Sequence, residues 1–573
     1  MKKKFLIPIL FLCTLSFSFA QEALKSVEED YYDFLSLRGI TKRPTLGYRT
    51  LSDNYWIFDE QTDFLENEDG TFSKVIIPGN ESNFNLWKNN NLGKTYTLWQ
   101  PKNTSSNIFL RGIKQNLKIK LYGPELFGSY NTTVPYGQND GALWQGVGFT
   151  TSLTTGIRAE FYGIELTIKP QISWSQNKDY DYISGIYGSP YSYNWFGGID
   201  LVQRYGPSSF WTLDLGDTEI RYSWYKFTFG FGNQSAWLGP AYLNPMLGSN
   251  NAPGYPKFDI GLRKTDVIIP LPKSKSLNLG QIEGRIWTGM LKESQYFDNN
   301  SENDKRMLNG LSISYAPSFI PGLTIGLNRI FETYWRNENL KYILRLFTTS
   351  RSNALSSSGN DEDQKFSLFA EWNFSKVGFT VYGEFGCDDF SYDTKANPFH
   401  TAIYTVGVKQ YIPLPFNLKS ELILEWNNFE MSQDFQLQWE YLGYYAHGFV
   451  GQGYTNNGQI IGAGTGYFGN SQLLQYKIYY PRGYTLLKFH RHNPNNNSIY
   501  SKAVYRVADA ESDFYRQWYH NFETYLTFGM ETGFFCTSDF LITLGFNYSK
   551  IYHRNNSYNS NNLNAFFMLK YEL

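Results

Sequence analysis

The chain has 573 residues, a formal net charge of −1, a mean hydropathy of −0.42 and an aromatic content of 18%. The near-neutral charge gives no electrostatic case for nucleic-acid binding. After the N-terminus we find no apolar run of about eighteen residues, which excludes transmembrane helices, and three cysteines are too few for a disulfide scaffold.

The first twenty residues are typical of a secretory signal peptide. Lysines at positions 2–4 precede an apolar stretch at 5–19, and Ser18 and Ala20 are the small residues before a cleavage site at Gln21. Cleavage removes three lysines and leaves 48 basic and 52 acidic residues, a net charge of −4. An uncleaved membrane anchor is the alternative, but the apolar stretch is shorter than the ~20 residues that span a bilayer.

Residues 21–105 are expected to form a separate region on the periplasmic side. Apolar residues between Glu22 and Leu37 recur every three to four positions, which predicts a helix, and Gly39 is a suitable stop. The stretch from Thr50 to Lys102 is mixed in composition, and we interpret it as helical or irregular. A disordered leader is the alternative interpretation of this region.

From residue 106 to 573, a period of two dominates. Ile164, Leu166 and Ile168 are separated by polar residues, and segments 117–122 and 421–426 follow a similar rule. In a strand this spacing places the apolar side chains on one face. That face could meet lipid in a membrane barrel or a second sheet in a secreted propeller or sandwich.

The end of the chain favours the membrane barrel. Apolar side chains alternate from Phe567 to Leu573, with an aromatic residue third from the end, as suits a strand that closes an outer-membrane barrel. Roughly 465 residues at about 25 per strand and connection give about 18 strands. We therefore predict an all-β protein, a transmembrane antiparallel β-barrel over residues 106–573 in the outer membrane, with a small N-terminal helical periplasmic segment.

Signatures of catalysis and of cofactor binding are missing from the sequence. It contains no GxSxG, HExxH, P-loop or CxxC motif. His490 and His492 could bind a metal, but Lys488 on the same face opposes a cation, so a polar row facing the lumen is the favoured interpretation. We expect no enzyme, no cofactor and no metal, and we leave open whether Cys387 and Cys536 form a bridge.

Three segments carry unusual chemistry: PYGQNDGALWQG at Pro135–Gly146, GDTEIRY at Gly216–Tyr222, and a stretch rich in Gly, Pro and Asn at Gly230–Leu262. Aromatic rings can pack on the C–H faces of sugars, and amides or carboxylates can bind the hydroxyl groups. The alternative is that these residues cap strands and pack a plug. The candidate carbohydrate-binding residues are Gln138, Asn139, Asp140, Trp144, Gln145, Trp237, Asn250, Asn251 and Tyr255.

These segments also carry a family resemblance. PYGQNDGALWQG, GDTEIRY and WLGPAYLNPMLGSNNAPGYPK, with the later GQIEGRIW, PGLTIGLNR and GYTNNGQIIGAGTG, resemble the capsule-assembly Wzi family in its Bacteroidetes branch. LSLRGI and TLGYRTLSDNYW near the N-terminus add weaker support. The resemblance implies an outer-membrane barrel of about eighteen strands with a small periplasmic helical region. It also implies a lectin that attaches or organises capsular or exported polysaccharide, but we transfer no individual binding residue from it.

Three functions are therefore compared. The leading hypothesis is a polysaccharide-binding, capsule-assembly barrel, the second a substrate-specific diffusion channel, and the third an outer-membrane hydrolase. A plugged lumen would favour the lectin, and an open constriction ringed by charges would favour the channel. The expected partners are capsular or exported polysaccharide, outer-membrane lipid or lipopolysaccharide, and the barrel-insertion machinery, with no nucleic acid.

Overall fold

The computed structural model describes residues 26–53, 56, 62–66, 72–76 and 87 of the N-terminal part and most of residues 117–571. Within 117–571, the residues not described are 183–190, 192, 197–198, 273–274, 348–361, 390–398, 417, 433–434, 437–442, 467, 495–522, 538 and 556. The predicted signal peptide lies outside the described residues.

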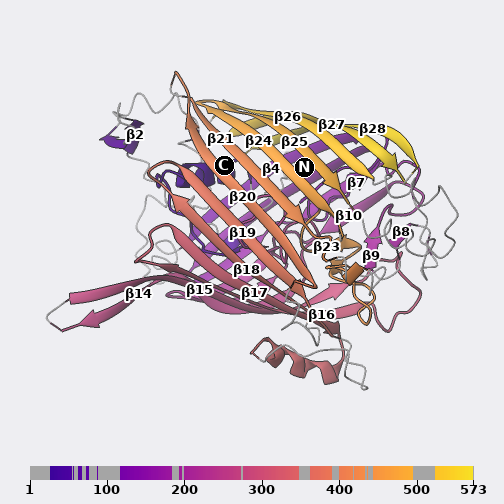
Figure 1. Ribbon diagram of the computed structural model, residues 1–573, viewed down its shortest axis with the longest axis horizontal. Helices are drawn as coiled ribbons and strands as arrows, with labels where there is room; N and C mark the ends of the chain where they lie inside the picture. The colour runs from indigo at the N-terminus through magenta and orange to yellow at the C-terminus, as the bar shows by residue number, and fades with distance from the viewer. Residues whose placement is uncertain are drawn as a thin grey trace, which may run out of the picture.

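One antiparallel sheet closes on itself to form a barrel (Figure 1). Its strands are β4 (Lys118–Asn131), β5 (Gly148–Phe161), β6 (Ile164–Ile168), β7 (Gln171–Ser175), β10 (Phe210–Asp214), β11 (Glu219–Trp224), β12 (Phe227–Gly232), β14 (Lys257–Leu271), β15 (Lys275–Lys292), β16 (Lys305–Pro317), β17 (Leu323–Tyr334), β18 (Glu362–Phe374), β19 (Phe379–Asp388), β20 (Ala402–Pro413), β21 (Lys419–Asn428), β24 (Asn470–Tyr480), β25 (Gly483–Asn493), β26 (Thr524–Thr537), β27 (Phe540–Arg554) and β28 (Tyr558–Tyr571). Because β6 and β7 are halves of one interrupted strand, and β10 and β11 of another, the described segments make eighteen strands around the barrel. The predicted fold class and strand number are confirmed.

The last strand closes the barrel against the first, as the C-terminal pattern predicts. β28 pairs with β27 on one side and with β4 on the other, where Asn564 lies opposite Asn131 and Lys570 opposite Glu125. Closure leaves neither strand with an unpaired edge along these residues, which is the condition for a sheet in a hydrocarbon layer.

The barrel wall has apolar side chains on its outer face and polar side chains on its inner face, the reverse of the arrangement in a soluble protein. Leu424 and Trp426 are 43% and 45% exposed on the outer surface, whereas Glu425 between them is 3% exposed. Segment 164–169 shows the same alternation, with its three apolar residues outside and its polar residues buried within. Lipid is the environment that accepts such an apolar outer surface, and the polar side chains are left for the lumen.

The two ends of the barrel differ in the length of their connections. Two-residue turns such as 162–163 and 481–482 lie at one end, and longer loops such as 132–147, 233–256 and 293–304 lie at the other. Barrels of this class carry short turns on the periplasmic side and long loops outside. None of the helices in the described part of the chain is long and apolar enough to cross a membrane.

Helix α2 (Val27–Ser36) lies across the short-turn mouth. Ser26 caps it by accepting a hydrogen bond from the Glu29 backbone N–H at 3.2 Å. The ring of Phe34 stacks on Tyr411 and Tyr479 of the wall, with centroids 5.1 and 4.6 Å apart. The apolar spacing within Glu22–Leu37 therefore reflects packing of this helix against the wall, rather than against a partner outside the barrel.

The segment we expected to be helical or irregular also contains strands. β2 (Thr62–Glu66) and β3 (Phe72–Ile76) form a hairpin, whereas η1 (Leu51–Asp53) is a short helical turn. β1 (Tyr48–Arg49) enters the barrel and pairs with β13 (Trp237–Leu238) from the loop after β12. The alternation there is too short to reveal these strands, since each is only two to five residues long.

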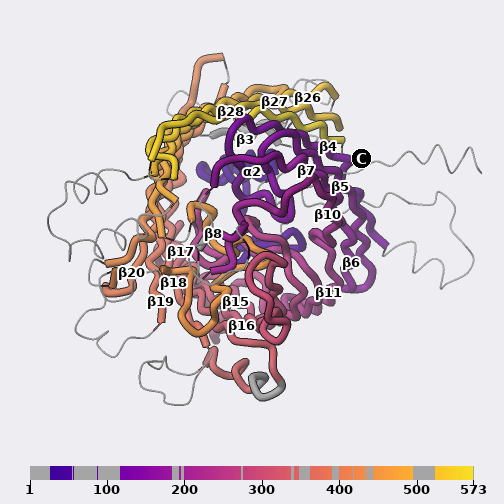
Figure 2. The backbone as a smooth tube through the Cα atoms, turned by 90° about the vertical axis from the view of Figure 1, so that its right-hand side faces the viewer, coloured from indigo at the N-terminus to yellow at the C-terminus, as the bar shows by residue number. Residues whose placement is uncertain are grey.

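The lumen is filled by a plug, which we define as residues 43–53, 233–256 and 443–466. Figure 2 looks along the barrel and shows the wall as a ring around chain from distant parts of the sequence. Plug residues Tyr48, Met246 and Tyr445 belong to one buried hydrophobic cluster with inward wall residues such as Trp287 and Ile403. The long-loop end holds the remaining elements: β8 (Asn194–Phe196), β9 (Ile199–Val202), β22 (Thr455–Asn456) and β23 (Gln459–Ile460). The helix η4 (Asn337–Phe347) lies in the connection between β17 and β18.

Glutamates of the wall hold the plug by its backbone. Glu425 accepts hydrogen bonds from the backbone N–H groups of Tyr242 and Asn244 at 2.6 and 2.9 Å. Glu384 accepts from Met246 at 3.2 Å, and Glu283 accepts from residues 46 and 47. Carboxylates make stronger bonds to such donors than neutral groups do, so these contacts fix the plug against the wall.

A buried charge network ties the wall to the N-terminal segment. Asp259 accepts hydrogen bonds from Arg221 at 2.6 Å and from Arg285 at 2.6 Å, and Arg285 also binds Asp53 at 2.8 Å. Arg221 is further paired with Glu219 at 2.8 Å. The GDTEIRY and GQIEGRIW segments thus supply inward-facing ion-pair partners rather than a ligand-binding surface.

Cys387 and Cys536 are both free thiols, so no bridge joins these two residues. Cys387 is buried in the wall, whereas Cys536 is exposed near the β26–β27 turn.

Candidate functional site

The PYGQNDGALWQG segment forms a loop that folds into the long-loop end of the barrel. Asn131, the last residue of β4, donates its side-chain amide to the carbonyl groups of Gln145 at 3.0 Å and Gly146 at 3.2 Å, which closes the base of the loop. The loop turns at Asn139 and Gly141, whose φ angles are +60° and +62°. Asparagine and glycine are the residues that tolerate this left-handed conformation.

Five of the nine predicted site residues line one cavity on the long-loop side, which we call the outer chamber. Its volume is about 250 Å³. The five residues are Gln138, Asp140, Trp144, Gln145 and Asn251. Asn139 is adjacent, where its backbone N–H donates to the Asn251 side chain at 3.3 Å. The loop and the plug therefore bring amide, carboxylate and indole groups from positions over a hundred residues apart to one place.

Trp144 lies between the outer chamber and a neighbouring cavity of about 400 Å³ that Tyr205, Asn233 and Gln459 also line. The second volume lies within the range of ligand pockets, roughly 300–1,000 Å³, and that of the outer chamber lies just below it. The indole Nε1–H of Trp144 has no hydrogen-bond partner among the described residues. An indole that lines two cavities can pack the exposed part of its ring against a sugar ring.

Four tyrosines continue outward from Trp144, and we call them the tyrosine row: Tyr191, Tyr193, Tyr205 and Tyr296. Tyr205 makes an edge contact with Trp144 at 5.0 Å between centroids, and Tyr296 lies 6.1 Å from Tyr205. Tyr193 and Tyr191 lie 5.5 and 6.0 Å from Tyr296. All four are partly exposed, so the row forms an aromatic surface that leads from the long loops to the outer chamber.

Hydrogen bonds hold these rings in place. The Tyr205 hydroxyl donates to the backbone carbonyl of Asn457 at 2.7 Å, and the Tyr191 hydroxyl donates to the Asn299 side chain at 2.8 Å. Rigid aromatic side chains lose little conformational entropy when they bind a ligand, which favours them as contact surfaces.

Three predicted site residues lie elsewhere. Trp237 is 1% exposed in the plug, where its Nε1–H donates to the Ala241 carbonyl at 2.9 Å, so a polymer cannot reach it. Tyr255 packs against the buried hydrophobic cluster of the plug. Asn250 lies at a cavity of about 30 Å³, which holds only one or two water molecules.

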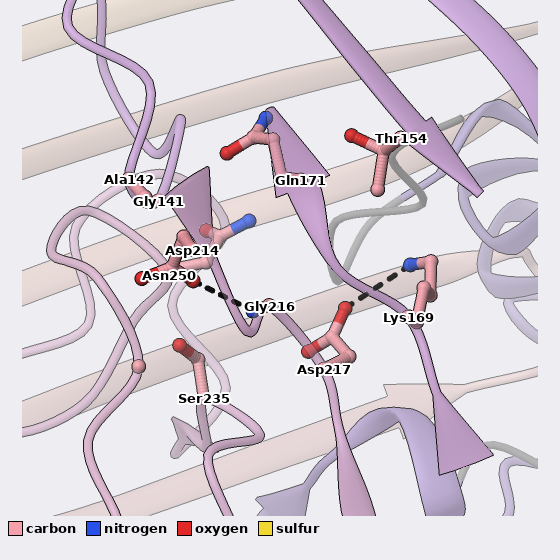
Figure 3. A pocket seen from close by; sticks show the side chains of 11 residues that line it. Gly141, Ala142, Thr154, Lys169, Gln171, Asp214, Gly216, Asp217, Ser235 and Asn250 are labelled. Carbon is pink, nitrogen blue, oxygen red and sulfur yellow. Dashed lines mark hydrogen bonds and ion pairs between the residues drawn. The ribbon is translucent and has the colours of Figure 1, made fainter. Parts of the chain in front are cut away.

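Figure 3 shows that small cavity, with Asp214 and Asn250 on one side and Lys169 bonded to Asp217 on the other. The Lys169–Asp217 distance is 3.1 Å. The cavity is therefore a gap between wall and plug, and it is too small to admit a sugar.

Burial raises the pKa of Asp140 to about 7, although the Gln145 side chain donates to its carboxylate at 2.9 Å. The folded protein therefore holds a proton on Asp140 that the unfolded chain releases near pH 4, so wild-type stability falls as pH rises from about 4 to about 7. We expect the stabilising effect of Asp140→Asn to grow between about pH 5 and pH 7 and then to level off.

The measurement for Asp140 is the melting temperature of the detergent-solubilised barrel across this pH range. An equal difference between variant and wild type at all pH values would contradict the proton assignment. Asp266, which is exposed on β14, supplies the control variant Asp266→Asn, for which we expect no such change.

Among the described residues, His490 and His492 lie next to each other on β25, with ring centroids 5.5 Å apart. His490 and His492 face inward, as the polar row predicts, and the His492 Nε2 contacts the Thr465 carbonyl at 2.7 Å. A second group, Asp363, Asp389 and His447, is close enough to hold a cation. However, the Lys365 ammonium already binds Asp363 at 2.6 Å.

His447 itself has no free nitrogen in that group. Its Nδ1 accepts the backbone N–H of Val450 at 3.1 Å, and its Nε2 contacts Asp389 at 3.1 Å. Both ring nitrogens are engaged with protein groups, so this cluster is a structural contact between the plug and the wall.

Sequence reasoning missed the tyrosine row and the second half of the outer chamber. Val202, Gln459 and His492 line the chamber from three separate loops or strands. The GYTNNGQIIGAGTG segment that contains Gln459 is distinctive in sequence, but nothing in it indicates a position beside Trp144. The tyrosines occur among 45 in the chain, so composition alone could not select them.

The family model described as capsule assembly protein Wzi matches residues 130–565. Comparison with curated protein sequences gives no match. Among solved structures, the chain is similar to Escherichia coli Wzi, an outer membrane protein involved in group 1 capsule assembly and a carbohydrate-binding β-barrel. The identity is 12% and the TM-score 0.56, over 97% of this chain and 100% of that one, and at this identity the likeness shows the fold.

The chain also resembles OprB of Pseudomonas putida and the outer membrane protein OprD of Pseudomonas aeruginosa, both more distantly. OprB has 12% identity and a TM-score of 0.37, over 81% of this chain and 96% of OprB. OprD has 8% identity and a TM-score of 0.36, over 80% of this chain and 93% of OprD.

Proposed function

The chain belongs to the capsule assembly protein Wzi family, and from that premise we propose that it binds surface polysaccharide at the long-loop end of its barrel and assists capsule assembly or attachment. The observation that carries the proposal is the continuous aromatic surface from the tyrosine row to Trp144, which ends at the amides of the outer chamber. Aromatic rings and neutral amides are the groups that recognise sugar rings and hydroxyls.

Each sugar unit would make only a few contacts along this row. Retention of a long polymer then comes from many such contacts, repeated over the many copies of the protein on one cell. The proposed binding residues are Gln138, Asn139, Asp140, Trp144, Gln145, Asn251, Tyr191, Tyr193, Tyr205 and Tyr296. We leave Trp237, Tyr255 and Asn250 out of this set because the first two pack in the plug and the third lies at a cavity too small for a sugar.

The barrel is proposed to lie in the outer membrane with its long loops outside. The apolar outer surface and the two-residue turns at the opposite end support this orientation. Residues 21–105 then begin on the periplasmic side, where α2 covers the short-turn mouth. Outer-membrane lipid or lipopolysaccharide would contact the wall, and the barrel-insertion machinery would be needed to place it there.

A binding role without catalysis is proposed because the plug fills the lumen and the outer chamber supplies no nucleophile beside a base. His492 is its one histidine among the described lining residues, and this ring contacts a backbone carbonyl instead of a hydroxyl or thiol. The filled lumen also supports the lectin over an open diffusion channel.

Replacing Trp144 or Tyr296 with alanine is expected to reduce retention of polysaccharide on cells, with the lost polymer appearing in the medium. Each aromatic contact is worth about 1 kcal/mol, so we expect a roughly fivefold weaker interaction per site for a single variant and a larger loss for the double variant. The measurement compares cell-bound and released polymer in a deletion strain complemented with each variant.

Trp224→Ala is the matched control, since this tryptophan is exposed on the wall beside the β11–β12 turn, at the opposite end of the barrel. All variants must reach the outer membrane at wild-type levels. If the control loses as much polymer as Trp144→Ala, or if neither site variant changes retention, the proposed binding surface is wrong.

A further inference from the structure

The loop that carries Trp144 also separates two cavities along one side of the lumen. The outer chamber lies on its outward side. On its inward side lies a cavity of about 360 Å³, the inner chamber, between the plug and the wall strands β4 and β25–β28. Both cavities are lined by the same five loop residues: Tyr136, Gly137, Gln138, Asp140 and Gln145.

Together the two chambers reach from one mouth of the barrel toward the other. The inner chamber begins at residues 26–28 beside α2 and follows β28 from Lys570 to Asn564, a rise of about 20 Å at roughly 3.3 Å per residue. The outer chamber continues to Val202 and Pro494 among the long loops. The loop is therefore a partition across a route that runs beside the plug.

The inner chamber carries charges of both signs among apolar side chains such as Phe127, Phe566 and Met568. The inner chamber is lined by Glu28, Glu125, Glu531, Lys488, His490 and Lys570, and Glu28 pairs with Lys570 at 2.8 Å. Charged and amide side chains such as Lys488, Glu531 and Asn547 line the chamber, and these groups favour contact with water or with polar solutes.

The partition is held more weakly than the plug. Two side-chain bonds hold it to the plug: Gln138 donates to the Asn244 side chain at 2.9 Å, and Asn139 donates to the Leu243 carbonyl at 3.1 Å. Two backbone bonds add to them, from the Asn139 N–H to the Asn251 side chain at 3.3 Å and from the Gly141 N–H to the Asn250 carbonyl at 2.6 Å. These are bonds between neutral groups, and each is weaker than a hydrogen bond to a charged group. Residues 242–244 themselves are fixed by the Glu425 carboxylate, so the loop can leave the plug while the plug stays in place.

We propose that the loop at residues 135–146 is a gate, and that its displacement opens a passage beside the plug for small, uncharged or zwitterionic hydrophilic solutes. Because glutamates and lysines both line the inner chamber, an ion of either sign meets like charges there, which favours uncharged or zwitterionic solutes over ions. The chamber volumes limit the passage to solutes of about one or two sugar units. This activity is distinct from polymer binding and does not rest on it.

The test is single-channel recording of the full-length barrel in planar lipid bilayers, without polysaccharide. Gln138→Ala/Asn139→Ala removes the two side-chain bonds to the plug, and we expect the open probability to rise about tenfold, equivalent to about 1.4 kcal/mol. Adding His490→Trp, which fills the inner chamber, is expected to abolish that current. Liposome swelling should admit glucose through the double variant and exclude the trisaccharide raffinose.

The matched control is Asn278→Ala/Gln281→Ala, which removes two amides from the short-turn end outside both chambers. Every variant is first checked for the folded barrel by its heat-modifiable mobility on SDS gels. The proposal is overturned if the double variant conducts no more than this control, or if His490→Trp leaves the current unchanged, because the current then follows another route.

Discussion

Asp259→Ala is expected to lower the free energy of unfolding by about 3–5 kcal/mol, because it removes one partner from a buried ion-pair network. The Asp259 carboxylate accepts from both Arg221 and Arg285, and all three side chains are buried. Without the Asp259 carboxylate, the Arg221 and Arg285 guanidinium groups each lose an ion-pair partner, and because they are buried, water cannot replace it. Arg285 would keep its ion pair with Asp53, and Arg221 would keep its ion pair with Glu219. The substitution therefore removes the bonds to Asp259 and leaves the rest of the network in place.

The measurement is equilibrium unfolding by urea of the barrel in lipid vesicles. Asp266→Ala is the matched control on the same strand, since Asp266 is exposed and bonds only the side chain of Gln281 at 2.8 Å among the hydrogen bonds described. Exposed polar contacts of this kind contribute about 0–1 kcal/mol. Equal effects of the two substitutions would show that the network does not stabilise the fold.

Glu425→Ala is expected to release the plug from the wall. The carboxylate accepts from the backbone of Tyr242 and Asn244 and from the Tyr382 hydroxyl at 2.8 Å. Each buried donor left without an acceptor costs about 1–3 kcal/mol, so the combined loss is several kcal/mol. Because the barrel hydrogen bonds are unaffected, we expect the wall to persist while segment 233–256 becomes accessible to protease.

Limited proteolysis of the folded barrel, followed by mass determination of the fragments, measures this release. Glu425→Gln is the graded comparison, since the amide keeps one acceptor oxygen but loses the charge, and its cleavage rate should lie between those of wild type and Glu425→Ala. If segment 233–256 is as resistant in Glu425→Ala as in wild type, the carboxylate does not hold the plug.

The candidate site was only partly predictable from the sequence. The segment around Trp144 was recognisable because planar aromatics and amides are concentrated within twelve residues. Trp237 belongs to an equally distinctive segment, yet it is buried in the plug, since a Gly-, Pro- and Asn-rich segment can fold into a lumen as readily as onto a surface. Tyr296 and Tyr205 carry no local signal, because their role depends on a contact between two loops 91 residues apart in the chain.

The sequence by itself determined the barrel. Alternation such as that of Leu424, Glu425 and Trp426 has a period that only a strand can satisfy, and the closing strand is encoded by the same pattern up to its last residues. Only the tertiary structure decided what fills the lumen and which loop residues meet. Inward positions are polar whether they line an open channel or bind a plug, so the role of Glu425 depends on the backbone of residues 242–244 being folded against it.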